Sequence, residues 1–524
     1  MKKIPKKNSL GGAFLSLSSA KFLSYFIGLV SSMLLARFRT LEEYGTYQQI
    51  LLVNNLVTSV IMLGLPSSLN YFLARADTAE EKNKFLSLYY TVNSLLSLMV
   101  GSLLVCLTPL MVRYFKNPLL TSFLYLMALL PWTKIITSSV ENLLVVFQKN
   151  RWLVAYRVSH SVVAVVIIAG VQLAGGNFQQ YLIIRLSAEI VYTILVYALA
   201  MILGGRLHFS VNMKLLRTVL IFSIPLGLAN ACGTLRHETD KFFIGLVTNT
   251  ERLALYSNAA KELPFTMISA SLTAVLLPHI ARLQKRNRTK EAVTLWKDVT
   301  VLSLIVNTFF AIGLFVFAEE AVLFLYSAKY RDASWVFAVY SLTYMVRCTY
   351  YGMILNTSGK TRLILRSSVL SLVLNAVLNV AFYFIMGFIG PAVATVVSTI
   401  AASLYVLYHT SRTTGIPYRQ IFPWKQALKI FLINVAVGAV FFGAKLLFSP
   451  HRTIPKIAFA IAMALLWAGV DFLIFRKTLK AKWKVMRRGQ DLQNEPEEIP
   501  AGEAAGAVTE AEEAIEAMTE DYHE

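Results

Sequence analysis

Charged side chains occur inside the long apolar stretches of this sequence, where they are costly. At the middle of a bilayer one such side chain costs about 2.5 to 3.5 kcal/mol on insertion scales, so we expect these groups to avoid lipid. The stretches contain seven basic and five acidic residues, which are Lys21, Lys134, Glu141, Arg185, Glu189, Arg236, Glu238, Asp240, Lys241, Lys261, Glu262 and Arg347.

Some of these charges are spaced so that they can neutralise one another on one helix. Residues three or four apart share a helix face. The pairs with this spacing are Arg185 with Glu189, Arg236 with Asp240, and Glu238 with Lys241. Structural ion pairs packed between helices are the plain interpretation of these groups.

Lys21, Lys134 and Arg347 have no acid three or four residues away. Each therefore needs a partner from another helix, from water or from a ligand. Arg157 and His160 differ from these three, because they follow a polar turn closely enough for Arg157 to reach the membrane surface.

No enzyme or metal-site pattern stands out in the sequence. The three cysteines, Cys106, Cys232 and Cys348, lie in apolar segments at spacings of neither a metal cluster nor a redox pair. No nucleophile motif or phosphate-binding glycine loop appears, so we expect no catalytic residues and no bound metal. The positive charges lie in short loops, where membrane orientation explains them better than nucleic-acid binding.

The composition predicts an all-α polytopic membrane protein. Hydrophobic residues make up 56% and charged residues 15% of the 524 residues, and an apolar run of roughly 20 residues crosses a bilayer. We predict about fourteen spans, near 10 to 36, 44 to 74, 84 to 111, 119 to 148, 151 to 174, 178 to 203, 218 to 247, 252 to 280, 298 to 326, 333 to 357, 363 to 388, 390 to 410, 427 to 448 and 456 to 475.

The distribution of basic residues predicts the orientation of these spans. With a cytoplasmic amino terminus, roughly 32 basic residues lie inside against roughly 10 outside. An even number of spans then places both termini in the cytoplasm of a bacterial-type plasma membrane. A signal peptide is the rival interpretation of the start, but the apolar run continues to Ala36, which is too long for an ordinary signal core.

The first and second sets of six spans look related. The sequence from Leu35 to Gln49 has a weak echo from Ile244 to Ala259, in which Glu42 and Tyr47 correspond to Glu251 and Tyr256 at one offset of 209 residues. An even repeat unit gives two parallel six-helix bundles that can rock around a cleft, which is typical of transporters. We predict bundles at 1–210 and 211–412, two added helices with a basic end at 413–488, and an acidic disordered tail at 489–524.

The chain resembles the oligosaccharide flippase family of the multidrug/oligosaccharidyl-lipid/polysaccharide exporter superfamily. The first span runs into LLARFRTLEEYGTYQQ, similar to the family's small residue and Arg, then Glu, Tyr and Gly, then Tyr. The seventh contains Pro225, Asp240, Ile244-Gly245 and Tyr256, similar to the pattern that opens the family's second bundle. The resemblance extends to about residue 478 and rests on loose motifs.

The resemblance implies a carrier that moves an undecaprenyl-pyrophosphate-linked oligosaccharide from the inner to the outer leaflet. Since cations hold pyrophosphate well, our hypothesis is that Lys21, Lys134, Arg236 and Arg347 line a central cavity and receive it. The remaining charges could be structural pairs or serve a coupling ion, H⁺ or Na⁺; these are Arg185, Glu189, Asp240, Lys241, Lys261 and Glu262. We expect a monomer that contacts membrane lipids and the polysaccharide biosynthesis machinery.

Two other functions stay open at this point. A multidrug or organic-cation antiporter of the same superfamily would share the twelve-span core but would rely on acidic groups, and basic groups slightly outnumber acids here. A membrane polysaccharide polymerase or glycosyltransferase would need a loop or domain around a reaction centre, and the longest predicted outer loop is short.

Overall fold

The computed structural model describes residues 10–491, and the side chains of residues 21–482 except positions 225, 226, 229, 268, 274 and 275. This described part is helical without a strand, which confirms the all-α prediction. The first half consists of α1 (Leu10–Phe38), α2 (Leu41–Ile61), α3 (Leu65–Arg75), α4 (Ala79–Phe115), η1 (Pro118–Phe123), α5 (Leu124–Thr137), α6 (Val140–Val146), α7 (Asn150–Leu173) and α8 (Phe178–Gly204).

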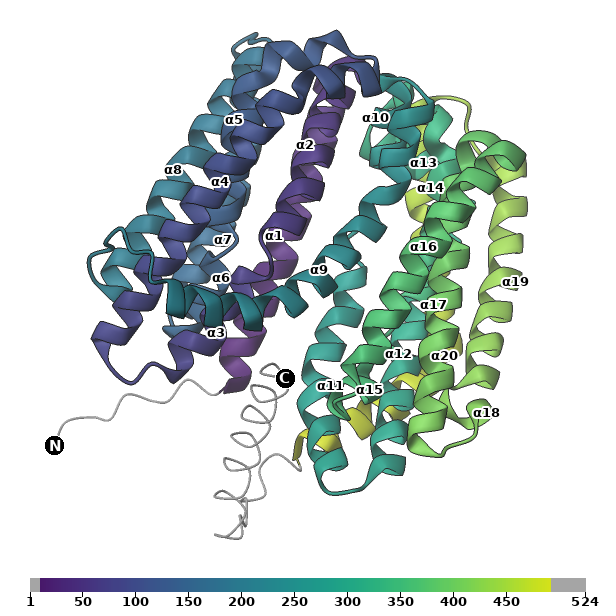
Figure 1. Cartoon of the computed structure of the whole chain (residues 1–524). Coiled ribbons are helices and arrows are strands. Elements are labelled where there is room, and N and C mark those ends of the chain that lie inside the picture. Colours follow the sequence, from purple (N-terminus) through teal and green to yellow (C-terminus); the bar gives the residue numbers. More distant parts are fainter. Residues whose placement is uncertain (1–9, 492–524) are drawn as a thin grey trace, which may run out of the picture. The chain divides into compact units, whose positions relative to one another are not determined.

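The second half and the added helices follow in order (Figure 1). The second half consists of α9 (Met213–Val247), α10 (Thr250–Ala259), α11 (Thr266–Lys285), α12 (Thr289–Val316), α13 (Ala318–Leu325), η2 (Ala328–Ala333), α14 (Ser334–Val346), α15 (Met353–Thr357), α16 (Thr361–Met386), η3 (Gly387–Ile389) and α17 (Gly390–Thr414). The added helices are α18 (Tyr418–Ile421), α19 (Trp424–Phe448) and α20 (Thr453–Asp491).

The helices are long and apolar enough for a polytopic membrane protein. Among the described residues nine helices are long and apolar enough to cross a membrane, or ten if the bent pair α2 and α3 forms one span. One of the nine, Thr361–Thr414, contains two predicted spans, α16 and α17. Three predicted spans are not among these helices, namely 218 to 247, 252 to 280 and 333 to 357. The predicted total of fourteen therefore exceeds the number of helices that are long and apolar enough.

Several predicted spans are broken rather than continuous. The range 44 to 74 bends by 42° between α2 and α3, where Gly64 adopts a positive φ of 72° that a helix cannot contain. The range 252 to 280 breaks between α10 and α11 at Lys261 and Glu262, and the range 333 to 357 breaks after α14 at Arg347. The range 298 to 326 divides at Phe317 into α12 and α13.

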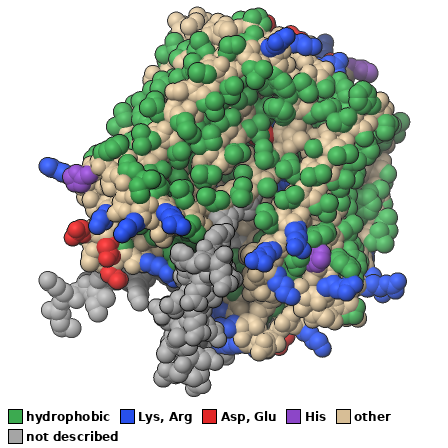
Figure 2. All heavy atoms as spheres, in the orientation of Figure 1, with side chains coloured by type: hydrophobic (Ala, Val, Ile, Leu, Met, Phe, Trp, Pro, Cys, Tyr) green, Lys and Arg blue, Asp and Glu red, His purple; other side chains and the backbone are tan. Residues whose placement is uncertain are grey.

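Local sequence signals start several helices where the structure has them. Thr40 with Glu43, Thr78 with Glu81, and Asn177 with Gln180 each form a capping box, in which the two residues satisfy backbone donors of the first turn. On the face shown in Figure 2, apolar side chains cover a broad band and Lys and Arg side chains gather mainly at its lower edge. This is the distribution expected of a membrane-spanning chain.

The order of elements repeats between the two halves. In the first half η1 is followed by α5, a short α6, and the long helices α7 and α8. In the second half η2 is followed by α14, a short α15, and the long helices α16 and α17. Since η2 begins at the position that the sequence offset predicts from η1 to within one residue, the structure supports the internal repeat.

Helix α9 contacts both halves. It packs against α2 and α3 of the first half and against α16 of the second, and Figure 1 shows it running out from beside α3. Tyr71 of α3 stacks on Phe222 of α9 at 4.3 Å between ring centroids. A Cβ on Gly64 would lie 2.5 Å from the Gly227 backbone nitrogen, so the two backbones approach as closely as only glycines allow.

The added helices pack on the second half through α12. Trp467 of α20 is fully buried, stacks on Phe441 of α19, and meets Phe309 of α12 edge to face. Among the described residues, those up to Phe475 form one compact unit, and those from Arg476 onward belong to another. The predicted boundaries near 210, 412 and 488 stay predictions, and the predicted disordered tail lies beyond residue 491, outside the described residues.

Candidate functional site

A first charged cluster lies in the first half, where three helices meet. Lys21 of α1 is 2.7 Å from Glu141 of α6, and Arg157 of α7 forms an ion pair with the same carboxylate. Glu141 is thus the partner from another helix that Lys21 needs. The sequence predicted that Arg157 reaches the membrane surface, but its guanidinium pairs with Glu141 instead. Together the three groups carry one net positive charge.

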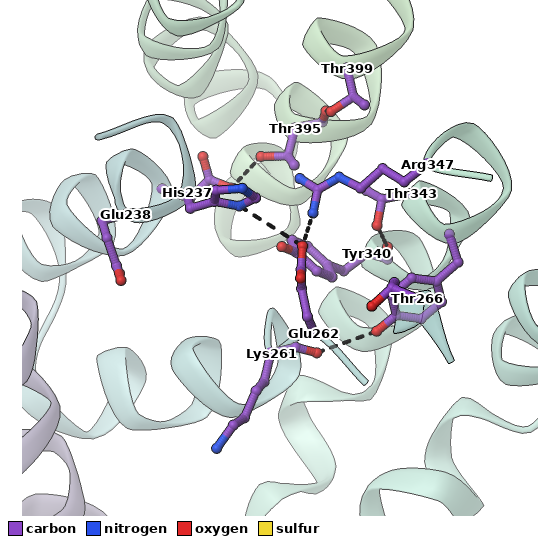
Figure 3. A network of polar contacts seen from close by, with 12 residues as sticks. His237, Glu238, Lys261, Glu262, Thr266, Tyr340, Thr343, Arg347, Thr395 and Thr399 are labelled. Atoms are coloured by element: carbon purple, nitrogen blue, oxygen red, sulfur yellow. Dashed lines mark hydrogen bonds and ion pairs between the residues drawn. The ribbon is translucent and has the colours of Figure 1, made fainter. Parts of the chain in front are cut away.

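A second charged cluster lies in the second half, at the breaks in two spans (Figure 3). Arg347, which ends α14, forms an ion pair with Glu262 in the segment between α10 and α11. His237 Nδ1 of α9 lies 4.0 Å from the same carboxylate. Arg236 and Arg347 line one cavity of about 280 Å³ with Thr399 and Ser403 of α17.

Tyr25 of α1 is influenced by charges of both clusters. It lies within electrostatic range of Glu262 in one cluster and of Glu141 and Arg157 in the other. Four side chains of this region are substantially exposed. The exposed fractions are 54% for Tyr25, 45% for Lys21, 42% for Glu141 and 38% for Glu262. Charges this exposed at membrane depth require water rather than lipid beside them.

A polar chain joins the halves beside these clusters. Lys134 of α5 donates to Asn55 Oδ1 of α2, and Asn55 Nδ2 donates to Glu238 Oε1 of α9 at 3.2 Å. Glu238 also pairs with Lys241 at 2.9 Å. Lys134 lines two cavities, one of about 240 Å³ with Arg185 and Glu189 and one of about 230 Å³ against α9.

A third ionic group is confined to the first half. Arg185 and Glu189 of α8 lie 2.5 Å apart, with the spacing that predicted their pairing. The same carboxylate lies 3.0 Å from His160 Nε2 of α7, and the His160 ring stacks near Tyr156. His160 therefore belongs to a partly buried polar group with Arg185 and Glu189.

Asp240 of α9 is buried among neutral hydrogen-bond donors. It accepts hydrogen bonds from Asn379 Nδ2 at 3.0 Å, from the Tyr256 hydroxyl at 3.3 Å and from the Thr395 hydroxyl. The expected pair with Arg236 is not formed, because Arg236 faces the cavity beside Arg347 while Asp240 turns toward α16 and α17. Asn379 Oδ1, next to this carboxylate, is buried without a hydrogen-bond partner.

The structure does not gather all predicted ligands around one cavity. Arg236 and Arg347 share one cavity and Lys134 lines two others, while Lys21 lines none of these three. Lys261 adjoins Glu262 in the sequence, yet its side chain points away from the Glu262 ion pair (Figure 3).

The sequence matches a known family over most of its length. Residues 34–335 match the polysaccharide biosynthesis protein family, and this stretch is more than half of the chain.

The chain belongs to that family.

Solved structures with the same fold are flippases and transporters. The lipid II flippase MurJ in an inward closed conformation is 19% identical, with a TM-score of 0.68 and coverage of 88% of this chain and 99% of that chain. An inward-facing multidrug resistance MATE transporter of the MOP superfamily is 11% identical, with a TM-score of 0.59 and coverage of 77% and 98%. A Vibrio cholerae MATE transporter is 14% identical, with a TM-score of 0.53 and coverage of 77% and 98%. Among curated proteins no match was found.

At these identities the solved structures establish the fold alone. This polysaccharide biosynthesis protein therefore shares its fold with a lipid flippase and with MATE transporters. The family model supports the sequence resemblance at the level of the family, and the solved structures support it at the level of the fold.

The structure of this family member also contains contacts that the sequence gave no reason to expect. At one end of the halves, Tyr44 of α2 donates to Asn258 of α10 at 2.7 Å, and Gln49 donates to the Thr250 hydroxyl at 3.1 Å. Lys329 of η2 donates to the Arg37 carbonyl at 3.1 Å.

Proposed function

We propose that this protein moves an undecaprenyl-pyrophosphate-linked oligosaccharide from the cytoplasmic to the outer leaflet of a bacterial plasma membrane. The observation that carries the proposal is the excess of basic over acidic groups in the two charged clusters. Counting Lys21, Arg157, Arg236 and Arg347 against Glu141 and Glu262, the two clusters hold an excess of two positive charges, and we take the space that they border to be polar. An anionic headgroup is the cargo that such a space would stabilise.

The proposed division of labour follows from which cations are already neutralised. Arg236 forms no ion pair within the described residues and lies beside the like charge of Arg347, so an anion between them would relieve their repulsion. Lys134 contacts an amide rather than an acid. We assign the pyrophosphate to Arg236 and Arg347 first and to Lys134 and Lys21 along the path.

The direction of transport rests on orientation. We place both termini in the cytoplasm, because basic residues dominate the loops on that side. The hydrogen bonds from Tyr44, Gln49 and Lys329 then fasten the halves at the outer end. Breaking them while forming contacts at the inner end would expose the polar space alternately to the two sides.

A coupling ion, H⁺ or Na⁺, is part of the proposal at Asp240. Its carboxylate, the unpartnered Asn379 Oδ1 and the Thr395 hydroxyl present oxygen atoms from three helices. Hard cations prefer such ligands, and cation binding there would join α9 to α16 and α17. The remaining charges within the spans are then structural or gating groups; these are Arg185, Glu189, Lys241, Lys261 and Glu262.

The experiment is transport by purified protein in proteoliposomes. A fluorescent undecaprenyl-pyrophosphate-linked oligosaccharide is added to one leaflet, and its arrival in the other is followed by quenching with a membrane-impermeant reductant. We expect Arg236→Gln to slow transport at least about tenfold, which corresponds to roughly 1.4 kcal/mol. Arg217→Gln, outside the cavity, is the control. Full transport by Arg236→Gln at normal protein level would exclude this residue from the path.

A multidrug or organic-cation antiporter is the second candidate, because MATE transporters share the fold. Asp240 is the observation that favours it, since an intramembrane carboxylate is the usual element of ion coupling. Ion-driven uptake of an organic-cation dye into the same proteoliposomes, without movement of the lipid-linked oligosaccharide, would replace the flippase proposal with this one.

A further inference from the structure

Asp471 is a buried carboxylate of α20 that the transport function proposed above does not use. The residue is 5% exposed, and neither carboxylate oxygen has a hydrogen-bond partner among the described residues. Asp240, by contrast, accepts three hydrogen bonds in its buried position. An ionised carboxylate without donors inside a membrane-spanning helix is strongly unfavourable, so the Asp471 site is incomplete as it stands.

The neighbours of Asp471 leave an excess of oxygen acceptors. Asn434 of α19 and Trp467, one turn earlier in α20, lie beside the carboxylate as hydrogen-bond donors, although neither reaches full hydrogen-bond geometry. Asn434 is fully buried and donates to the Ile430 carbonyl at 3.1 Å, while its Oδ1 has no donor. The two carboxylate oxygens and the Asn434 amide oxygen, on neighbouring side chains, are therefore all without a full hydrogen bond.

Trp467 and the residues around it fix this arrangement. Its ring stacks on Phe441 at 5.3 Å between centroids, and a Cβ on Gly438 would lie 2.9 Å from the ring. Phe475, one turn beyond Asp471 on the same helix face, is also buried. Because these groups are packed, Asp471 cannot swing to water without separating α20 from α19.

No charged side chain balances Asp471. It forms no ion pair among the described residues, and burial, Asn434 and Trp467 are the influences on its carboxylate. Helix α14 has no charged residue, and none of the described charged residues on the other packed elements is among the influences on Asp471. These residues are Lys290, Glu291, Lys297 and Asp298 of α12, Lys425, Lys429 and Lys445 of α19, and Lys456, Arg476, Lys477, Lys480 and Lys482 of α20.

We propose that Asp471 and Asn434 form a binding site for a small monovalent cation, a proton or Na⁺, between the two helices that follow the repeat. A proton on Asp471 gives a hydroxyl that donates to Asn434 Oδ1. Na⁺ instead takes the same oxygen atoms as ligands. Either cation neutralises the carboxylate and holds α20 against α19 and α12, and its release leaves a buried charge that loosens this contact.

The proton is tested first, with the full chain in lipid nanodiscs. Infrared difference spectra recorded while the pH is raised should contain the loss of a carboxylic-acid C=O band, and Asp471→Asn should lack this band. The melting temperature of the wild type should fall as the proton leaves, and that of Asp471→Asn should not follow it. Asp332→Asn, at an exposed carboxylate, is the matched control and should behave as the wild type.

Sodium gives a different pattern in the same samples. At alkaline pH, replacing K⁺ by Na⁺ at constant ionic strength should raise the melting temperature of the wild type by a few degrees and leave Asp471→Asn unchanged. Asp240→Asn, at the coupling site proposed above, should keep this response if the two sites are separate. A response lost in Asp240→Asn but kept in Asp471→Asn assigns Na⁺ to Asp240 and overturns sodium binding at Asp471.

A second variant keeps the proposal testable if Asp471→Asn does not fold. Asn434→Leu retains the carboxylate and removes the amide oxygen that we assign to the proton or Na⁺, so we expect the acid C=O band to shift to higher frequency, or the Na⁺ response to disappear. The proposal is overturned if this variant and the wild type have the same acid C=O band, the same pH dependence of the melting temperature and the same response of the melting temperature to Na⁺. It does not depend on which cargo the protein carries.

Discussion

The Tyr44 hydroxyl and Asn258 Oδ1 lie 2.7 Å apart, although 214 positions separate the two residues in the chain. Both belong to the segments in which the internal repeat was recognised, and both are buried. The hydrogen bond therefore joins corresponding segments of the two repeat units, at the end of the halves that we assign to the outer face.

Replacing Tyr44 by Phe should make the outer end open more often. The change removes a hydrogen bond worth about 1 kcal/mol, which shifts the ratio of closed to open states by roughly fivefold. The measurement is the distance distribution between spin labels at Leu119 and Asp332 in a cysteine-free background. Tyr408→Phe, at an exposed tyrosine of α17, is the control. Identical distributions for all three proteins would exclude Tyr44 as a gate contact.

The pair Arg347 and Glu262 separates a structural role from a role in cargo binding. Arg347→Gln and Glu262→Gln should each reduce transport, the first by at least about tenfold, which is roughly 1.4 kcal/mol. If Arg347 holds pyrophosphate, the double variant should stay as slow as Arg347→Gln. Recovery of transport in the double variant would show instead that the ion pair is structural, because removing both charges leaves neither unpaired.

Lys134→Met should weaken transport without weakening the fold. Asn55 keeps its hydrogen bond to Glu238 in this variant, and a cation without an acid partner leaves the membrane interior. We expect an apparent substrate affinity about tenfold lower, roughly 1.4 kcal/mol, with a melting temperature equal to or above that of the wild type. Lys82→Met, at a helix start outside the cavities, is the control. A lower melting temperature for Lys134→Met would point to a structural lysine.

Gly64→Ala should separate α3 from α9. The new Cβ would lie 2.4 Å from the Ser223 carbonyl oxygen and 2.5 Å from the Gly227 nitrogen, so the backbones must move apart. Gly175 has a similar positive φ, but a Cβ there meets nothing within 4 Å. Gly175→Ala therefore reports the backbone strain alone, of order 1 to 3 kcal/mol. Thermal unfolding should show a clearly larger loss for Gly64→Ala; equal losses would mean that the close approach relaxes freely.

Acid should loosen the contact between the added helices and the second half. Burial raises the pKa of Glu319, but Lys456, Arg331 and Lys445 outweigh it and lower the net pKa below its ordinary value. A lowered pKa stabilises the fold above the unfolded-state pKa, near 4.3 for Glu, and this stabilisation is lost as the pH falls through the folded-state pKa. The melting temperature of the wild type should therefore fall more steeply below about pH 5 than that of Glu319→Gln. Glu80→Gln is the control and should behave as the wild type. Parallel curves for Glu319→Gln and the wild type would remove Glu319 from this contact.

The fold could be predicted from sequence wherever an apolar run is uninterrupted. The ranges predicted for α1, α7, α8 and α19 agree with the structure to within a few residues at most ends. The breaks at Gly64, at Lys261 with Glu262, and at Arg347 could not be placed, because each break depends on tertiary contacts.

Local spacing predicted side-chain pairs only when both members sit on one helix. Arg185 with Glu189 and Glu238 with Lys241 are such pairs. Lys21 takes Glu141 from another helix, which spacing cannot reveal. Asp240 leaves its own helix neighbour for Asn379 and Thr395, since neutral donors from two helices surround it. Asp471 was overlooked because a single acid near the end of a span resembles a boundary residue.

The Lys329 side chain joins the halves through main-chain oxygens, since it donates to the carbonyls of Arg37 and Arg39. Every residue type supplies a carbonyl, so this contact does not depend on the side chains at positions 37 and 39. Relatives can therefore exchange those two arginines while keeping the lysine and the contact. Coevolution between position 329 and either arginine would be weak, and contact inference from aligned relatives would miss this junction.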